Sequence, residues 1–204
     1  MDPLILSKVQ QSLQTLIEHR VLVNNKESEH CVEFSFVAPD AKFVADLSSR
    51  PKINAYLIGL SEDNHRRRSD PVRTVLNKDK TQHSIYVEPR YVDMTYMLTV
   101  WSKDEVGSAM IEHLLLGYLI SGLGYFDFLP EDIQAEHELD TAPFGVRLTL
   151  FGSEYADKIS GQVWQAMGST PKPSLMLSLS VPVPIAEPGT RSAVRDIAQA
   201  LNRM

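Results

Sequence analysis

Residues 89–101 read PRYVDMTYMLTVW and form the clearest strand pattern in the chain. Every second position carries an apolar side chain, and these positions hold Val92, Met94, Tyr96, Leu98 and Val100. Successive side chains of a strand point to opposite faces of its sheet, so this apolar set shares one face. Asp93, Thr95 and Thr99 point the other way. The pattern predicts a long strand that covers a core on one face and meets water or a partner on the other.

Shorter patterns on both sides complete the expected fold. Residues 53–60 are apolar on both faces, which predicts a central strand, and further strands are expected at residues 32–36, 85–87, 146–151 and 175–181. Helices are expected at residues 3–24, after Ser102 up to Gly124, and after Ser153 up to Gly168. The stretch at 175–181 is expected to be the last strand. This order predicts an α+β fold with a mixed, largely antiparallel sheet flanked by helices.

Prolines divide the C-terminal end from the rest. Pro182, Pro184 and Pro188 suggest a tether, so we expect one domain over residues 1–185 and a tethered segment over 186–204. Thr190 caps a possible amphipathic helix, whose apolar face holds Val194, Ile197, Ala198 and Leu201. Such a helix either docks on a partner or folds back onto its own core.

Composition excludes several classes of protein. The chain has 204 residues, a net charge of −6 and one cysteine, Cys31. An acidic chain of this kind is not expected to bind nucleic acid, and one cysteine cannot build a disulfide framework. The longest apolar run, residues 114–126, is shorter than the roughly 20 residues that span a bilayer. We therefore expect a protein made in the cytoplasm, with no signal peptide and no membrane insertion.

The sequence has no pattern typical of catalysis. It lacks a phosphate-binding glycine loop, a serine-nucleophile elbow and a pair of histidines four residues apart. Glu136-His137-Glu138 is interpreted as a solvated acidic loop rather than a chelate, and Trp101 and Trp164 as packing residues. We expect no enzyme activity, no cofactor and no metal. A small α+β enzyme stays open as an alternative if a pocket gathers groups such as Glu112 and His113.

Charge is distributed unevenly along the chain. Residues 50–80 are rich in bases and include Arg66, Arg67 and Arg68, whereas residues 127–140 contain acids but no Lys or Arg. Opposite patches on one subunit suit a head-to-tail contact that closes a ring. Two unrelated solvated loops explain the same distribution equally well.

Four blocks, in their order and spacing, resemble a known family. The blocks are VLVNN at 21–25, INAYLIGLSEDN at 53–64 followed by Arg68, the strand at 89–101, and a closing strand–helix–strand with RLTL at 147–150, Val163-Trp164 and PSLMLSL at 173–179. Over most of residues 1–185 the chain is similar to the cap, or tail-terminator, proteins of contractile injection systems, the phage-tail-like particles.

The resemblance implies a structural role without catalysis. Such a protein forms a homohexameric ring that ends the inner tube and the contractile sheath away from the baseplate. The particle would be assembled in the cytoplasm and then released or membrane-anchored. A monomeric adaptor that binds sheath or another partner is the alternative.

We hypothesise two contact sites, one between copies in the ring and one with sheath or tube. The ring interface is expected to join the basic loop Arg66, Arg67 and Arg68 to the acidic residues Glu131, Asp132 and Glu136 of a neighbouring copy. Contact with sheath or tube is expected from the terminal segment, through Arg191, Val194, Arg195, Ile197 and Leu201.

Overall fold

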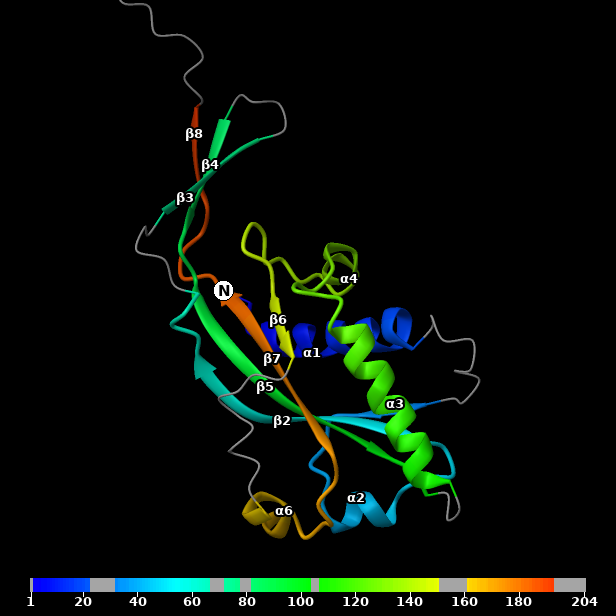
Figure 1. Cartoon of the computed structure of the whole chain (residues 1–204). Helices are drawn as coiled ribbons and strands as arrows, with labels where there is room; N and C mark the ends of the chain where they lie inside the picture. Colours follow the sequence, from blue (N-terminus) through cyan, green and yellow to red (C-terminus); the bar gives the residue numbers. More distant parts are fainter. Residues whose placement is uncertain are drawn as a thin grey trace, which may run out of the picture.

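The computed structural model describes residues 2–22, 32–66, 72–77, 82–103, 107–150 and 161–192. Its helices are α1 (Ile5–Leu16), the π-helical η1 (Ile17–Val21), α2 (Ala41–Ala45), α3 (Ser108–Leu123), α4 (Glu131–Glu136) and α6 (Gly161–Met167). Its strands are β1 (Glu33–Ser35), β2 (Lys52–Glu62), β3 (Val72–Leu76), β4 (Gln82–Val87), β5 (Arg90–Trp101), β6 (Arg147–Leu150), β7 (Ser174–Val183) and β8 (Gly189–Ser192). Figure 1 shows a main sheet with helices beside it and a narrow arm that leaves one end. The predicted α+β class is confirmed.

The main sheet has five strands in the order β1-β2-β5-β7-β6. Only β1 and β2 run parallel among the described pairs of this sheet, and the others are antiparallel, as predicted. The long strand β5 lies in the middle, where Tyr96 faces Leu57 of β2 on one side and Leu177 of β7 on the other. The stretch that sets the strand pattern is therefore the centre of the sheet.

Helices α1 and α3 cover one face of the main sheet (Figure 1). The predicted apolar face of β5 lies beneath them, with Met94, Tyr96, Leu98 and Val100 all less than 2% exposed. The amphipathic α1 buries Val9, Leu13 and Leu16 completely against this core. Apolar spacing along α1 and β5 thus decides which surfaces form the main core.

The other face of β5 is also buried, which corrects the predicted half-buried strand. Met97, Trp101 and Met176 form a second core with Trp164 of α6 and Phe43 of α2. The indole rings of Trp101 and Trp164 lie 6.4 Å apart, and Trp101 donates a 2.9 Å hydrogen bond from Nε1 to Thr99 Oγ1. The interpretation of both tryptophans as packing residues is confirmed. Thr95 and Thr99, expected to meet water or a partner, are fully buried.

A second sheet has three strands in the order β3-β4-β8 and forms the arm. Two of its strands were not predicted. Residues 72–76 form β3 and residues 189–192 form β8. The prediction that residues 175–181 are the last strand is therefore wrong, and no helix begins at Thr190. Polar residues within β3 and β8 obscure their strand character in the sequence. The rest of the expected terminal helix, with Val194, Arg195, Ile197 and Leu201, lies outside the described residues.

Two short helices were not predicted. α2 begins after Asp40, whose carboxylate accepts a 2.8 Å hydrogen bond from the backbone N–H of Phe43, and α4 forms within the acidic stretch at 127–140. Both have too few residues for a helical period to be visible. Helix α3 starts at Ser108, later than Ser102 suggested, and Ser102 instead donates its backbone N–H to Glu112 Oε1. Within the described ranges, no helix combines the length and apolarity needed to cross a membrane.

Candidate functional site

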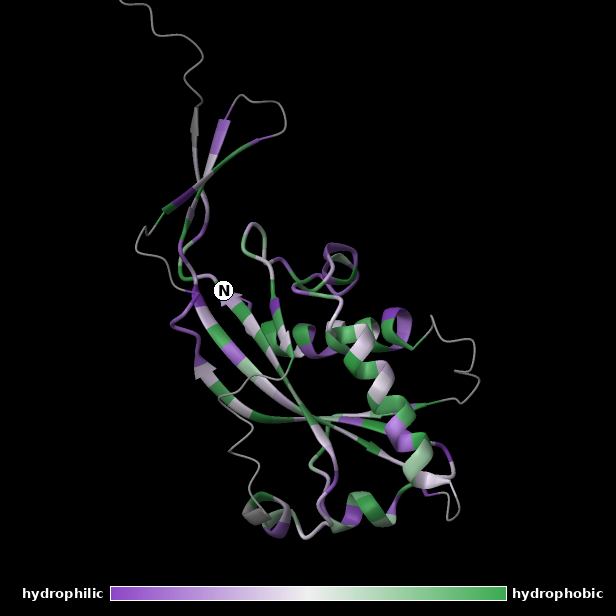
Figure 2. Cartoon of the chain, viewed as in Figure 1, coloured by the Kyte–Doolittle hydropathy of each residue, from purple (hydrophilic) through white to green (hydrophobic). Residues whose placement is uncertain are grey.

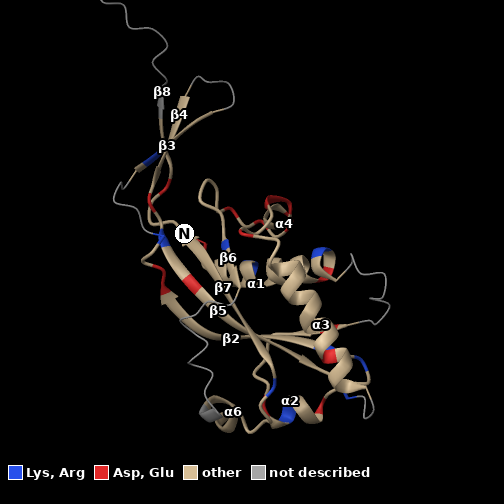
Figure 3. Cartoon of the chain, viewed as in Figure 1, with Lys and Arg blue, Asp and Glu red and all other residues tan. Residues whose placement is uncertain are grey.

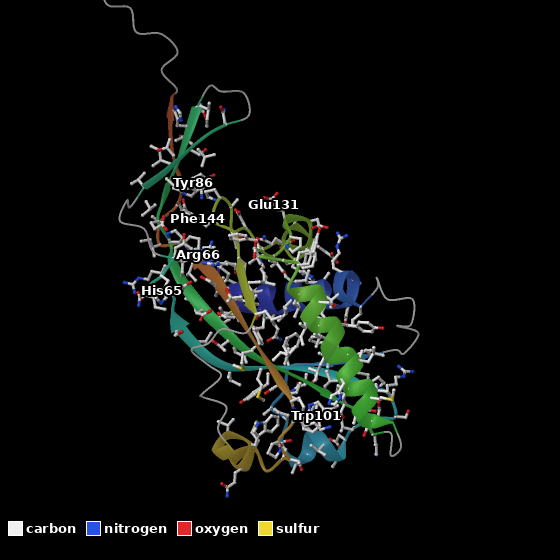
Figure 4. All side chains as sticks on the ribbon, viewed as in Figure 1. His65, Arg66, Tyr86, Trp101, Glu131 and Phe144 are labelled. Atoms are coloured by element: carbon white, nitrogen blue, oxygen red, sulfur yellow. The ribbon has the colours of Figure 1, made fainter. Side chains whose placement is uncertain are left out.

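A groove of about 1310 Å³ lies where the arm meets the body. Residues from β3, β5, β6, α4 and the loop 140–145 line it. Figure 4 labels His65, Arg66, Glu131 and Phe144 around this region. The groove therefore brings the predicted basic and acidic stretches together within one subunit.

Arg66 sits in the turn that follows β2, and its guanidinium points into the protein. Its Nη1 donates to the Ser180 carbonyl at 2.7 Å, and its Nη2 donates to the carbonyls of Phe144 at 2.5 Å and Gly145 at 2.8 Å. One side chain thus ties the end of β2 to β7 and to the loop 141–145. Arginine suits this position because its planar fork holds several donors in fixed directions.

Aromatic rings enclose the same guanidinium. Arg66 Cζ lies 4.4 Å from the ring centroid of Tyr91 and 5.7 Å from that of Phe128. Burial lowers the pKa of Arg66, while the nearby Tyr91 and Asp63 oppose that change. A cation over aromatic faces and bonded to carbonyls is stabilised in place, so Arg66 anchors the groove wall.

The loop 141–145 has the shape that Arg66 requires. The N–H groups of Phe144 and Gly145 both bond to the Thr141 carbonyl, at 2.9 and 3.0 Å. Gly145 has a φ of +67°, and a Cβ there would meet Phe128 at 3.3 Å. A residue without a side chain is needed at this turn, because L residues rarely adopt positive φ.

The arm is attached to the same loop. Arg73 of β3 donates to the Pro143 carbonyl at 3.0 Å, and its Cζ lies 5.8 Å from the Phe144 ring centroid. Tyr86 of β4 meets the Phe144 ring edge-on at 6.3 Å, and Tyr91 of β5 does the same from the body. Phe144 therefore sits between arm and body and links them.

Acidic residues also line the groove. Glu88, Asp127, Glu131, Glu138 and Asp140 line it together with the bases Arg73 and Arg147. Figure 3 shows acidic side chains on α4 and in the loop that follows it. A groove with both signs of charge suits contact with a protein surface.

The predicted interface residues have different environments. Glu131 and Glu136 are exposed on α4, whereas Asp132 forms an ion pair with Arg20 at the end of η1. Arg66 is occupied by contacts within its own chain. Arg67 and Arg68 lie outside the described residues. Of the predicted sheath or tube contacts, only Arg191 is described, as part of the backbone of β8.

No catalytic arrangement is visible in the described part of the chain. Within it, no three His, Cys, Asp or Glu side chains converge on a possible metal site. His137 bonds to Thr15 Oγ1 at 2.7 Å, so it is held between α4 and α1. Glu112, named as a possible pocket residue, is buried and pairs with Lys172 at 2.5 Å, while His113 is exposed.

Sequence reasoning missed the aromatic and glycine members of the groove. Tyr91, Phe144 and Gly145 carry no distinctive spacing, because they contact Arg66 from two segments that lie far apart in the sequence. Pro143 followed two residues later by Gly145 was the one local signal for a tight turn here.

Two solved structures share this architecture. The PVC sheath/tube terminator of an extracellular contractile injection system, in its extended state, superimposes with a TM-score of 0.58 at 14% identity, over 97% of this chain and 63% of that chain. The anti-feeding prophage cap, a tube-terminating cap, does so with a TM-score of 0.57 at 16% identity, over 95% and 60%. The chain thus shares their fold and spans less than two thirds of the length of each.

A sequence comparison identifies the family. Residues 8–195 match the family model described as the Pvc16 N-terminal domain, and the chain belongs to this family. No curated protein matches the chain. The resemblance that the sequence blocks suggested is confirmed.

Proposed function

We propose that this chain is a structural cap, which ends the inner tube and the contractile sheath of a phage-tail-like particle at the end away from the baseplate. The observation that carries the proposal is the match of almost the whole chain to two terminator structures. The family assignment over residues 8–195 supports the same role. The proposed role requires shape and contact surfaces and involves no catalysis.

The groove supports this role through rigidity. Arg66, Phe144 and Arg73 hold the arm, the loop 141–145 and the main sheet in one arrangement. A terminator must present its contact surfaces in a fixed relative orientation, because a ring closes only at one angle between neighbours. These internal contacts are what such a subunit needs.

The oligomer and its contacts are finer parts of the proposal. We expect a homohexameric ring, assembled in the cytoplasm on a completed tube and sheath. The charge-based contact between Arg66, Arg67 and Arg68 of one copy and Glu131, Asp132 and Glu136 of the next stays a prediction. The three acidic residues are exposed in the described structure. The contact of residues 190–204 with sheath or tube also stays a prediction.

Electron microscopy of particles tests the proposal directly. Deleting this protein should give tubes and sheaths of uncontrolled length, and adding it back should restore a uniform length. Particles of normal length in its absence would overturn the proposal. The purified chain should show six-fold rings in negative stain, whereas a monomeric adaptor would show single subunits and the mass of one chain.

A further inference from the structure

The two faces of the arm differ in what they contact. Strand pairing places Val72 opposite Val87, Thr74 opposite Ile85 and Leu76 opposite His83, so these residues share one face of the arm. Arg73 and Tyr86 lie on the other face, which contacts Pro143 and Phe144 of the body. The arm therefore turns its more polar face toward its own body and its aliphatic face away from it.

The aliphatic face of the arm lacks a core within the subunit. Val72 and Leu76 are each 43% exposed and Val87 is 37% exposed. No residue described in β3, β4 or β8 is fully buried or belongs to either core cluster. A small sheet gains stability from packing on its hydrophobic face, and the described residues leave Val72, Leu76 and Val87 partly open to solvent.

Helix α3 also exposes apolar side chains on its outer face. Most of its residues are apolar, and Figure 2 shows α3 largely green to white with a hydrophilic part in its first half; a helix this apolar is normally buried over most of its surface. Its inner face packs on the main core through Leu115, Leu119 and Leu123. On the outer face Met110 is 83% exposed and Leu114 43% exposed.

The outer face of α3 is suited to receive another layer. Met110, Leu114, Gly117 and Ser121 follow one another at helical spacing, which puts them on one stripe. A Cβ at Gly117 would meet nothing within 4 Å, so the middle of the stripe is open space. The one acidic residue of α3, Glu112, is buried and paired, and α3 contains no Lys, Arg or Asp.

We infer that the aliphatic face of the arm of one copy packs on the outer face of α3 of the next copy. A second copy is the occupant because each surface supplies the layer that the other lacks, a helix on a sheet, and both expose aliphatic side chains, Val72 and Leu76 on the arm and Met110 and Leu114 on α3. Their lengths also agree, since α3 spans about 24 Å and strands of five or six residues span about 17–20 Å.

The geometry of this contact is head-to-tail. The arm leaves the body at one end, whereas α3 runs across the body away from it (Figure 1). Two different surfaces on one subunit generate a ring when the rotation between neighbours closes. The inference rests on the proposed cap ring and adds the surfaces that join its subunits.

Complementation between two damaged chains tests the contact. Leu76→Glu places a charge on the arm face, and Leu114→Glu places one on the α3 stripe. Each variant alone should lose the ring and have the mass of one chain by native mass spectrometry. An equimolar mixture should form one-to-one heterodimers and stop there, because each chain then contributes one intact surface.

Matched controls separate the contact from general effects of charge. Gln82→Glu adds the same charge to an exposed residue on the other face of the arm, and Gln165→Glu adds it to an exposed residue of α6. Both should keep the ring. Cross-linking gives a second readout in a Cys31→Ser chain: Leu76→Cys mixed with Met110→Cys or Leu114→Cys should yield an intermolecular disulfide on mild oxidation.

Each outcome has a distinct meaning. If the unmodified chain forms rings and both glutamate variants keep them, the inference is overturned while the cap proposal stands. Loss of the ring in both variants without heterodimers in the mixture also overturns it, since the arm then contacts something other than α3. If the unmodified chain remains a monomer even on tubes, the proposed ring itself fails.

Discussion

The guanidinium of Arg66 stacks over the ring of Tyr91, with its Cζ 4.4 Å from the ring centroid. Tyr91 in turn donates its hydroxyl to Glu88 Oε1 at 2.8 Å, just before β5 begins. The basic residue and the central strand are thereby joined at the point where the arm leaves the body. An arginine that the sequence places in a charged loop acts here as an internal anchor of the fold.

Removing this anchor should destabilise the subunit. Arg66→Ala leaves the carbonyls of Ser180, Phe144 and Gly145 without their donor, and hydrogen bonds to charged groups contribute about 1.5–3 kcal/mol each when made singly. Because the three act together and the site is half-buried, we expect a loss of about 2–4 kcal/mol in the free energy of unfolding, measured by urea denaturation.

Two further variants show whether the shape of the arginine matters. Arg66→Lys keeps the charge but has no planar fork, so it should recover only part of the loss. Arg73→Ala removes one exposed bond, to the Pro143 carbonyl, and should cost less than about 1.5 kcal/mol. Full stability of Arg66→Lys would contradict the proposed anchoring by several fixed donors.

The Glu112–Lys172 pair should be needed for stability rather than for chemistry. Glu112→Ala removes the partner of Lys172 and the acceptor of the Ser102 N–H, so we expect a loss of about 3 kcal/mol. Glu112→Gln keeps an acceptor for Ser102 and should cost less. Thermal unfolding followed by circular dichroism measures both variants. Equal losses of stability in Glu112→Ala and Glu112→Gln would show that only the charge of Glu112 contributes to stability.

Tyr96→Phe should leave the protein as stable as before or more stable. The Tyr96 side chain is fully buried, burial raises its pKa, and its hydroxyl has no hydrogen-bond partner among the described residues. An unsatisfied buried hydroxyl costs about 1–3 kcal/mol, which the substitution removes. Tyr91→Phe is the matched control and should lower the free energy of unfolding by about 1 kcal/mol, because it breaks the bond to Glu88. A loss in Tyr96→Phe would show that the hydroxyl has a partner.

Glu33 should make stability depend on pH in the acid range. Ser48 donates to its carboxylate at 2.9 Å and Lys52 lies 3.1 Å away, and these contacts lower the pKa of Glu33 below its ordinary value of 4.5. A lowered pKa in the folded state gives stability that is present above pH 4.5 and is lost as pH falls through the folded value. The difference in unfolding free energy between the parent chain and Glu33→Gln should therefore shrink below pH 4.5. A difference that stays constant with pH would contradict this role.

Part of the candidate site could be foreseen and part could not. The basic and acidic stretches are visible as runs of charge in the chain, yet Arg66 and Glu131 prove to line the same groove. A run of charged residues does not show which way each side chain points. The sequence could therefore not indicate that Arg66 turns inward onto Tyr91. The carbonyls that bind Arg66 belong to the backbone. Every residue has such a carbonyl, so residue types do not show which ones accept these hydrogen bonds.

The sequence by itself determined the main sheet. The alternation from Val92 to Val100 and the apolar stretch at 53–60 place two central strands, because the order of apolar and polar side chains along a strand is a local property of the chain. The order of blocks also determined the family, which the match over residues 8–195 confirms.

Only the tertiary structure decided the arm and the second core. The strand β8 pairs with β4 across about a hundred residues of chain, and Trp164 covers Met97 and Trp101 from a distant helix. Pairings between remote segments depend on hydrogen bonds and contacts that exist only in the folded chain. For this reason short polar strands, and the aliphatic face that they expose, became visible only in the folded chain.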